Sequence, residues 1–71
     1  MKFAKDEIAY IPVYSYDNGK KHIYEKVTIE NTWVDEKWGN MYSFIHQNGD
    51  RCNSCPEECL LNQKEYEEVR Y

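Results

Sequence analysis

Apolar and polar residues alternate along much of this chain, which is the pattern of a strand with one buried face. The clearest case is residues 22–33, where Ile23, Val27 and Ile29 share one face. Glu25 interrupts that face, and we expect it near a strand end or a barrel rim. Three further strands are predicted: residues 7–16, which are rich in β-branched and aromatic residues, and residues 41–46 and 51–54, which lie on either side of a turn signal.

Two Asn-Gly pairs predict where the chain reverses. Asn18-Gly19 follows the first predicted strand, and Asn48-Gly49 separates the third from the fourth. Asn-Gly supplies the positive φ angles that a tight type I′ hairpin requires. A longer polar connection, residues 35–40, joins the second and third strands. We therefore predict a mainly β fold, a four-stranded antiparallel meander.

Pro12 bears on the place of the first strand in that sheet. Proline has no N–H to donate to a ladder, so it is found on edge strands or where a strand is broken. The first strand is therefore predicted to be an edge strand or to be broken at Pro12. Such an edge also leaves a homodimer open, by pairing with a second copy.

The chain changes character after residue 55. Pro56 opens what looks like one helical turn. Asn62 followed three positions later by Glu65 is the pattern of a helix N-cap with a capping box. We predict a short helix over residues 62–70, with Tyr66 and Val69 docked on the sheet. The whole chain, residues 1–71, is expected to form a single small domain.

Composition narrows the functional classes. The chain is 41% hydrophobic and 15% aromatic, which suits a folded domain. Its net charge of −4 arises within residues 31–71, where eight acidic residues face four basic ones. The one basic cluster, residues 20–22, is too small to replace the counterions of a nucleic acid. The expected partner is therefore another protein with a basic surface, rather than a nucleic acid.

The sequence also carries an expectation about location. No apolar run approaches the ~20 residues that span a bilayer. The first seven residues lack the apolar core of a signal peptide. We therefore expect no membrane association, a cytoplasmic location and reduced thiols.

Three segments resemble the small SH3-like barrel proteins of phages and Gram-positive bacteria. Residues 3–11 (FAKDEIAYI) resemble their opening segment without its glycine, and residues 26–30 (KVTIE) resemble their second strand. Residues 56–61 (PEECLL), with 64–68 (KEYEE), resemble their closing turn and short acidic helix. The resemblance implies a partly open SH3-like barrel and a module that docks another protein. A phage-encoded inhibitor of a host defence or regulatory protein, acting in the host cytoplasm, is its concrete form. A fifth strand is not evident.

Three cysteines within eight residues form the densest group of potential metal ligands. Cys52 and Cys55 have the spacing of a zinc knuckle, Cys59 is a third candidate ligand and His46 a fourth. Pro56, however, stands where knuckles usually carry glycine. We prefer the interpretation that Cys52 and Cys59 are small buried residues and Cys55 is a surface thiol. No cofactor is then expected, and a zinc-stabilised structural module remains the alternative.

Catalytic machinery is not indicated. Either His22 or His46 is able to activate a thiol in principle. The sequence contains no oxyanion-hole motif, and a domain this small excludes water poorly. We therefore expect no enzymatic activity and no catalytic residue.

Aromatic residues are the strongest candidates for binding. Seven tyrosines and two tryptophans exceed what a small core holds, and exposed aromatics are favoured anchors at protein interfaces. Tyr10, Tyr14 and Tyr16 are predicted to share one face of the first strand. The alternatives are that the tyrosines bury their rings with hydroxyls at the rim, and that the acidic residues are a solvated helix face. The predicted partner-binding residues are Tyr14, Tyr16, Trp33, Trp38, Glu65, Glu67 and Glu68.

Overall fold

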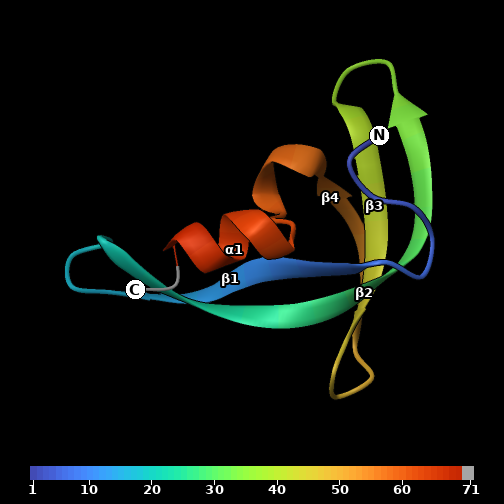
Figure 1. Cartoon of the computed structure of the whole chain (residues 1–71). Helices are drawn as coiled ribbons and strands as arrows, with labels where there is room; N and C mark the ends of the chain where they lie inside the picture. Colours follow the sequence, from blue (N-terminus) through green and yellow to red (C-terminus); the bar gives the residue numbers. More distant parts are fainter. Residues whose placement is uncertain (70–71) are drawn as a thin grey trace.

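The computed structural model describes residues 1–69. Over these residues, four antiparallel strands form one open sheet in the order β1-β2-β3-β4, and a short helix follows (Figure 1). The mainly β meander with a C-terminal helix is therefore confirmed. Residue 70 of the predicted helix lies outside the described residues. The elements are β1 (Ile8–Tyr16), β2 (Lys21–Asp35), β3 (Gly39–His46), β4 (Arg51–Pro56), the 3-10 turn η1 (Glu57–Cys59) and α1 (Gln63–Val69).

The connection between β2 and β3 is shorter than predicted. Val34 pairs with Asn40 and Asp35 with Gly39, so most of the polar segment belongs to the ladder. The Asp35 carboxylate accepts the backbone N–H groups of Lys37 and Trp38, at 2.8 and 3.0 Å. A side chain that satisfies the turn's own backbone donors allows this tight reversal. Both strands are therefore longer than the alternation alone indicated.

The two Asn-Gly turns differ in geometry. At the first, Asp17, Asn18 and Gly19 have positive φ, 56°, 58° and 81°, and the Lys20 N–H bonds to the Asp17 carbonyl. Asn18 and Gly19 have the positive φ angles predicted for the centre of a type I′ turn, and Asp17 before them has a positive φ as well. At the second turn, Gly49 has positive φ, 93°, and Asn48 does not. A glycine bulge following a type I turn explains the difference, because it needs positive φ only at the glycine.

The core lies on one face of the coiled sheet. Ala9 pairs with Val27, Ile29 with Phe44, and Tyr42 with Cys55, so that consecutive strands contribute to the same face. Ile11 and Cys52 are partly buried against its border. The buried cluster comprises Phe3, Ala9, Val27, Ile29, Tyr42, Phe44, Cys55 and Leu60.

A bulge in β1 separates the tyrosines. Pro12 pairs with Tyr24 but Tyr14 pairs with Ile23, so one extra residue, Val13, is inserted. Paired residues share a face and neighbours alternate, so the bulge moves Tyr14 and Tyr16 to the face opposite Tyr10. The predicted single row of Tyr10, Tyr14 and Tyr16 is therefore wrong. Of the two alternatives predicted for the first strand, the edge position is confirmed; β1 is not broken at Pro12 but continues through it with a shift in register.

Helix α1 packs on the Tyr10 face of β1. The Tyr66 ring stacks on the Tyr10 ring, with centroids 4.0 Å apart, and meets Tyr24 edge-on. The predicted capping box is present: the Glu65 N–H bonds to Asn62 Oδ1 and the Asn62 N–H to Glu65 Oε1. The docking of Tyr66 is thus confirmed. Val69 is exposed, so its predicted docking is wrong.

Leu61 occupies the position of the missing fifth strand. Its backbone exchanges two 2.9 Å hydrogen bonds with that of Tyr10, at the outer edge of β1. Pro12 is the next residue of β1 whose backbone faces that edge, and it has no N–H to continue the pairing. Within residues 1–69, this contact therefore stays a single bridge and the sheet stays open.

The β1–β2 hairpin extends beyond the packed body. Figure 1 shows its turn at the far left, past the end of α1. The radius of gyration is 12.2 Å, against about 11 Å for a compact chain of this length. We call residues 12–24 the hairpin arm. The rest of the described chain, which carries the core, is the body.

Candidate functional site: the Trp38 groove

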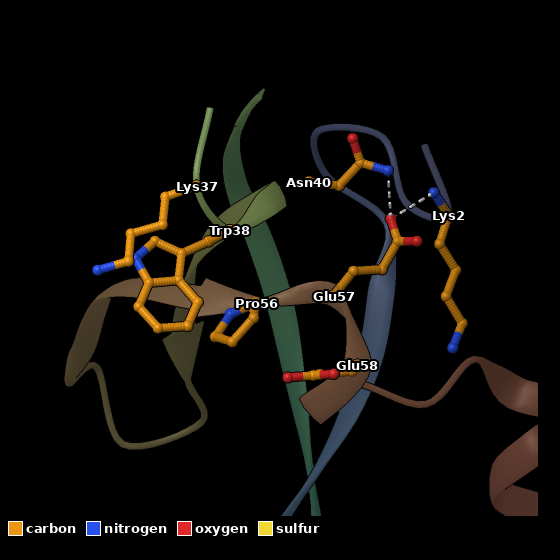
Figure 2. Close-up of a pocket in the computed structure, with 7 residues that line it drawn as sticks. All are labelled: Lys2, Lys37, Trp38, Asn40, Pro56, Glu57 and Glu58. Carbon is orange, nitrogen blue, oxygen red and sulfur yellow. Dashed lines mark hydrogen bonds between the residues drawn. The ribbon is translucent and has the colours of Figure 1, made fainter. Parts of the chain in front are cut away.

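An open groove of about 480 Å³ lies where the β2–β3 turn meets the end of β4 (Figure 2). Trp38 projects from the turn on one side, and Pro56 ends β4 beside it. The register explains this meeting, because Met41 at the start of β3 pairs with Pro56. We call this site the Trp38 groove. It is lined by Lys2, Lys37, Trp38, Asn40, Pro56, Glu57 and Glu58.

Trp38 is held in place through its backbone and exposed through its ring. The Asp35 carboxylate accepts the Trp38 N–H, which fixes the turn. Trp38 is nevertheless 61% exposed to solvent. The Lys37 ammonium lies 5.2 Å from the indole centroid, in the range of a cation–π contact. The ring is therefore an accessible aromatic surface on a turn whose backbone is held by Asp35, and a cation lies beside it.

Glu57 forms the polar wall of the groove. Its Oε2 accepts the Lys2 backbone N–H at 3.0 Å, the Asn40 amide at 3.1 Å and the Tyr42 hydroxyl. The Tyr42 hydroxyl in turn accepts the backbone N–H groups of Lys2 and Phe3. The donors, Tyr42 first, hold the pKa of Glu57 below its usual value. The pKa of Tyr42 is raised above its usual value, mainly by burial and to a smaller extent by the hydrogen bond to Glu57. Glu57 thus anchors the wall of the groove as a carboxylate.

Glu58 differs from its neighbour. It is exposed on η1 and lines the groove beside Pro56 (Figure 2). Its carboxylate lies on the same open surface as the Trp38 ring, whereas that of Glu57 points toward Asn40 and Lys2. The groove therefore combines an exposed indole and an exposed carboxylate with the ammonium groups of Lys37 and Lys2 in the same lining.

The other predicted binding residues are divided among three places. Trp33 is half-buried opposite Met41, so it is not a free anchor. Tyr14 and Tyr16 lie on the hairpin arm, with ring centroids 6.4 Å apart. Figure 1 shows the β1–β2 turn and the β2–β3 turn at opposite ends of the molecule. Trp38 and the arm tyrosines therefore do not form one surface.

The predicted acidic residues lie on α1. Glu65 accepts the Asn62 N–H and pairs with the Lys2 ammonium, and these two donors lower its pKa. Glu67 accepts a hydrogen bond from Gln63 at 2.9 Å, and Glu68 is exposed. None of the three lines the Trp38 groove. Glu65 serves the helix cap.

The cysteines are arranged differently from the preferred interpretation. Cys55 is buried, Cys59 is exposed and Cys52 is half-buried, so the predicted positions of Cys55 and Cys59 are wrong. Cys55 faces inward because it pairs with the core residue Tyr42. Burial, with the neighbouring Cys59 and Cys52, raises the pKa of Cys55 to about 12. The inward direction of that thiol follows from the strand register.

The ligand set of the zinc alternative is not assembled. His46 Nδ1 lies 3.1 Å from the Glu25 carboxylate, on the far side of the β3–β4 hairpin from η1. In the part of the chain that the structure describes, no group of three or more His, Cys, Asp or Glu side chains is placed to hold a metal ion. Glu25, which interrupts the apolar face of β2, instead has His46 and the Gln47 N–H as partners.

Sequence reasoning identified Trp38 but not its surroundings. Asn40, Pro56 and the Glu57–Glu58 pair were not assigned to a site with it. The second Asn-Gly turn was the available signal. When the two strands are paired residue by residue outward from Asn48-Gly49, residue 41 falls opposite residue 56. Prolonging that hairpin to its open end would have brought the β2–β3 turn next to η1.

We compared the chain with known protein families, curated proteins and solved structures. No protein-family model, no curated protein and no solved structure matched this chain. The resemblance to SH3-like barrels therefore stays a prediction. Among residues 1–69, no helix has the length and apolar character needed to cross a membrane.

Proposed function

We propose that this chain is a small protein-binding module without catalytic activity, and that the Trp38 groove binds a basic side chain of its partner. The observation that carries this proposal is the exposed Trp38 ring, which lines the same groove as the Glu58 carboxylate. Tryptophan is one of the residues enriched among interface hot spots. A protein inhibitor that occupies a basic surface of its target is one form of this function.

Local chemistry supports a cationic ligand. The Lys37 ammonium lies over the indole ring, so one cation of the chain is already in contact with it. A guanidinium of the partner has a planar shape that stacks on the ring and an N–H fork that pairs with Glu58. The excess of acidic residues in 31–71 attracts such a partner over a longer range.

The remaining lining supports binding more than chemistry. Glu57 is the ionisable group most enclosed by donors, and those donors keep it ionised and fixed in the wall. The groove is open to solvent, so it offers little exclusion of water from a reaction. Its open form is that of a contact surface.

The test is partner capture with Trp38→Ala. The immobilised chain is incubated with lysate of its native cell, and bound proteins are identified by mass spectrometry. Trp38→Ala should lose the specific partner, and with purified partner the affinity should fall by about 2 kcal/mol, or roughly 30-fold. Val34→Ala removes another exposed side chain near the same turn and should bind as the unmodified chain does.

Two results would contradict the proposal. One is equal capture by folded Trp38→Ala, which would show that the ring is not an anchor. The other is affinity that does not change with salt, because contacts between exposed charges weaken as ionic strength rises. Circular dichroism of each variant separates loss of binding from loss of fold.

A further inference from the structure

The core face of the sheet continues onto the hairpin arm, where no part of the described chain covers it. Ala9 and Val27 pair on this face and are fully buried. The next pair along the hairpin, Ile11 and Glu25, is half-buried. Beyond the bulge, Tyr14 pairs with Ile23, and these residues are 61% and 52% exposed. One face thus passes from core to surface within a few residues.

The fold leaves this face unpartnered for a structural reason. Helix α1, the element nearest the arm, packs on the opposite face, where Tyr66 contacts Tyr10 and Tyr24. The body ends before the bulge. A two-stranded ribbon is marginally stable by itself, so exposed Tyr14, Tyr16 and Ile23 are a disadvantage for an isolated molecule. We call the arm face the surface formed by Tyr14, Tyr16, Lys21 and Ile23 of the arm together with Glu25 at its base.

Charge placement on this face indicates what covers it. Lys21 and Glu25 lie two residues before and two residues after Ile23 on β2, so all three share a face. When two such faces pack antiparallel about a two-fold axis at Ile23, Lys21 of each copy meets Glu25 of the other. A parallel arrangement would place lysine against lysine and glutamate against glutamate. The charges of Lys21 and Glu25 are therefore complementary to those of a second copy only when the two faces pack antiparallel.

We propose that the arm face is the docking site for a second copy of this chain, packed antiparallel about a two-fold axis near Ile23. The contact buries Tyr14, Tyr16 and Ile23 of both copies between the Lys21–Glu25 pairs. It is a face-to-face contact. Pairing through the β1 edge is impeded by Pro12, which has no N–H, and by the bulge after it.

The expected dimer is weak and reversible. Each copy contributes three large apolar side chains, which is below the ~800 Å² per partner of a typical stable interface. Glu25 is held at the base of the arm by His46 and Gln47, so its carboxylate is positioned before the second copy arrives. A carboxylate has enough lone pairs to accept the Lys21 ammonium as well.

The experiment is sedimentation velocity of the full chain from about 1 µM to about 1 mM. The sedimentation coefficient should rise with concentration and should remain that of the monomer in Ile23→Asp. Lys21→Glu and Glu25→Lys each place like charges opposite one another, so each alone should associate at least about tenfold more weakly. Mixed together, these two variants should associate, because both contacts are then opposite in sign. Lys20→Glu makes the same charge change at the next residue, off the arm face, and should dimerise normally.

Each other outcome overturns the proposal. A monomer throughout the concentration range would exclude the dimer. A dimer that persists in Ile23→Asp would place the interface elsewhere. Failure of the mixed variants to associate would reject the antiparallel arrangement. Should Glu25→Lys not fold, Glu25→Gln keeps one oxygen to accept the Gln47 N–H, and its amide NH2 is able to donate to a neutral His46 Nδ1, so it should fold and still weaken association. None of these variants touches the Trp38 groove, so partner capture through Trp38 can succeed or fail independently.

Discussion

Strand β2 runs through both the body and the hairpin arm, and its apolar residues have opposite environments in the two regions. Val27 and Ile29 are buried in the body, whereas Ile23 on the same strand is half exposed. The alternation of apolar and polar residues along β2 is similar in the body and in the hairpin arm. What differs is coverage: Leu60, Phe3 and the β3 side chains pack on the body, whereas Tyr14, Tyr16 and Ile23 on the arm face stay 45–61% exposed. Burial is therefore a property of the neighbours of a strand as much as of its own pattern.

The largest effect that tests this comparison is on stability. Ile29→Ala should lower the free energy of unfolding by about 2–5 kcal/mol, because it leaves a cavity in a packed core. A domain of this size has about 4–11 kcal/mol in total, so the variant should be near its threshold. Ile23→Ala should change stability by less than about 0.5 kcal/mol in the monomer. Urea unfolding at low concentration measures both, and similar losses would show that the arm is as packed as the body.

A second pair of variants compares two tyrosines. Tyr42→Phe removes the hydroxyl that accepts the buried Phe3 N–H and donates to Glu57. Leaving those groups without a partner should cost about 1–3 kcal/mol. Tyr14→Phe removes an exposed hydroxyl on the arm and should be nearly neutral. The same urea titration applies; a neutral Tyr42→Phe would mean that water replaces the hydroxyl and that the groove wall is not closed.

Local signals along the sequence predicted the elements well. Asn18-Gly19 determines its turn type, because few residues accept two successive positive φ angles. Asn62 and Glu65 satisfy each other's backbone donors, which is a contact between near neighbours. The β2 alternation reports a face that is buried over half its length. Each of these features depends on residues within about four positions of one another.

Features that depend on pairing were not predicted. The bulge at Val13 reverses the faces of Tyr14 and Tyr16, and the alternation alone does not reveal it. Cys55 is inward because of its partner Tyr42, although its own flanking residues suggest a surface thiol. For the candidate site, Trp38 was found as an aromatic residue in a polar segment. Its neighbours Glu57 and Glu58 come from a strand end that only the register places there.

The smallest expected effect is the loss of stability at acidic pH. It should arise from carboxylates of the body and not from those of the hairpin arm. The pKa of Glu57 is lowered by the Tyr42 hydroxyl and the Lys2 N–H, and that of Glu65 by the Asn62 N–H and Lys2. Both folded values lie below the unfolded value of 4.5. Below that pH the unfolded chain binds more protons, so stability is full above pH 4.5 and declines as pH falls through the folded pKa values.

Two variants test whether the loss of stability at acidic pH arises in the body. Glu57→Gln with Glu65→Gln should lower stability at neutral pH and flatten its dependence on acid, because neither group then titrates. Asp17→Asn, which removes a charge on the arm, leaves both body carboxylates in place and should retain the full decline. Urea midpoints measured at about pH 7 and about pH 3 give the comparison. An equal decline in the double variant would place the acid-sensitive contacts outside the Glu57 network and the helix cap, and the wall of the Trp38 groove would then owe its rigidity to packing alone.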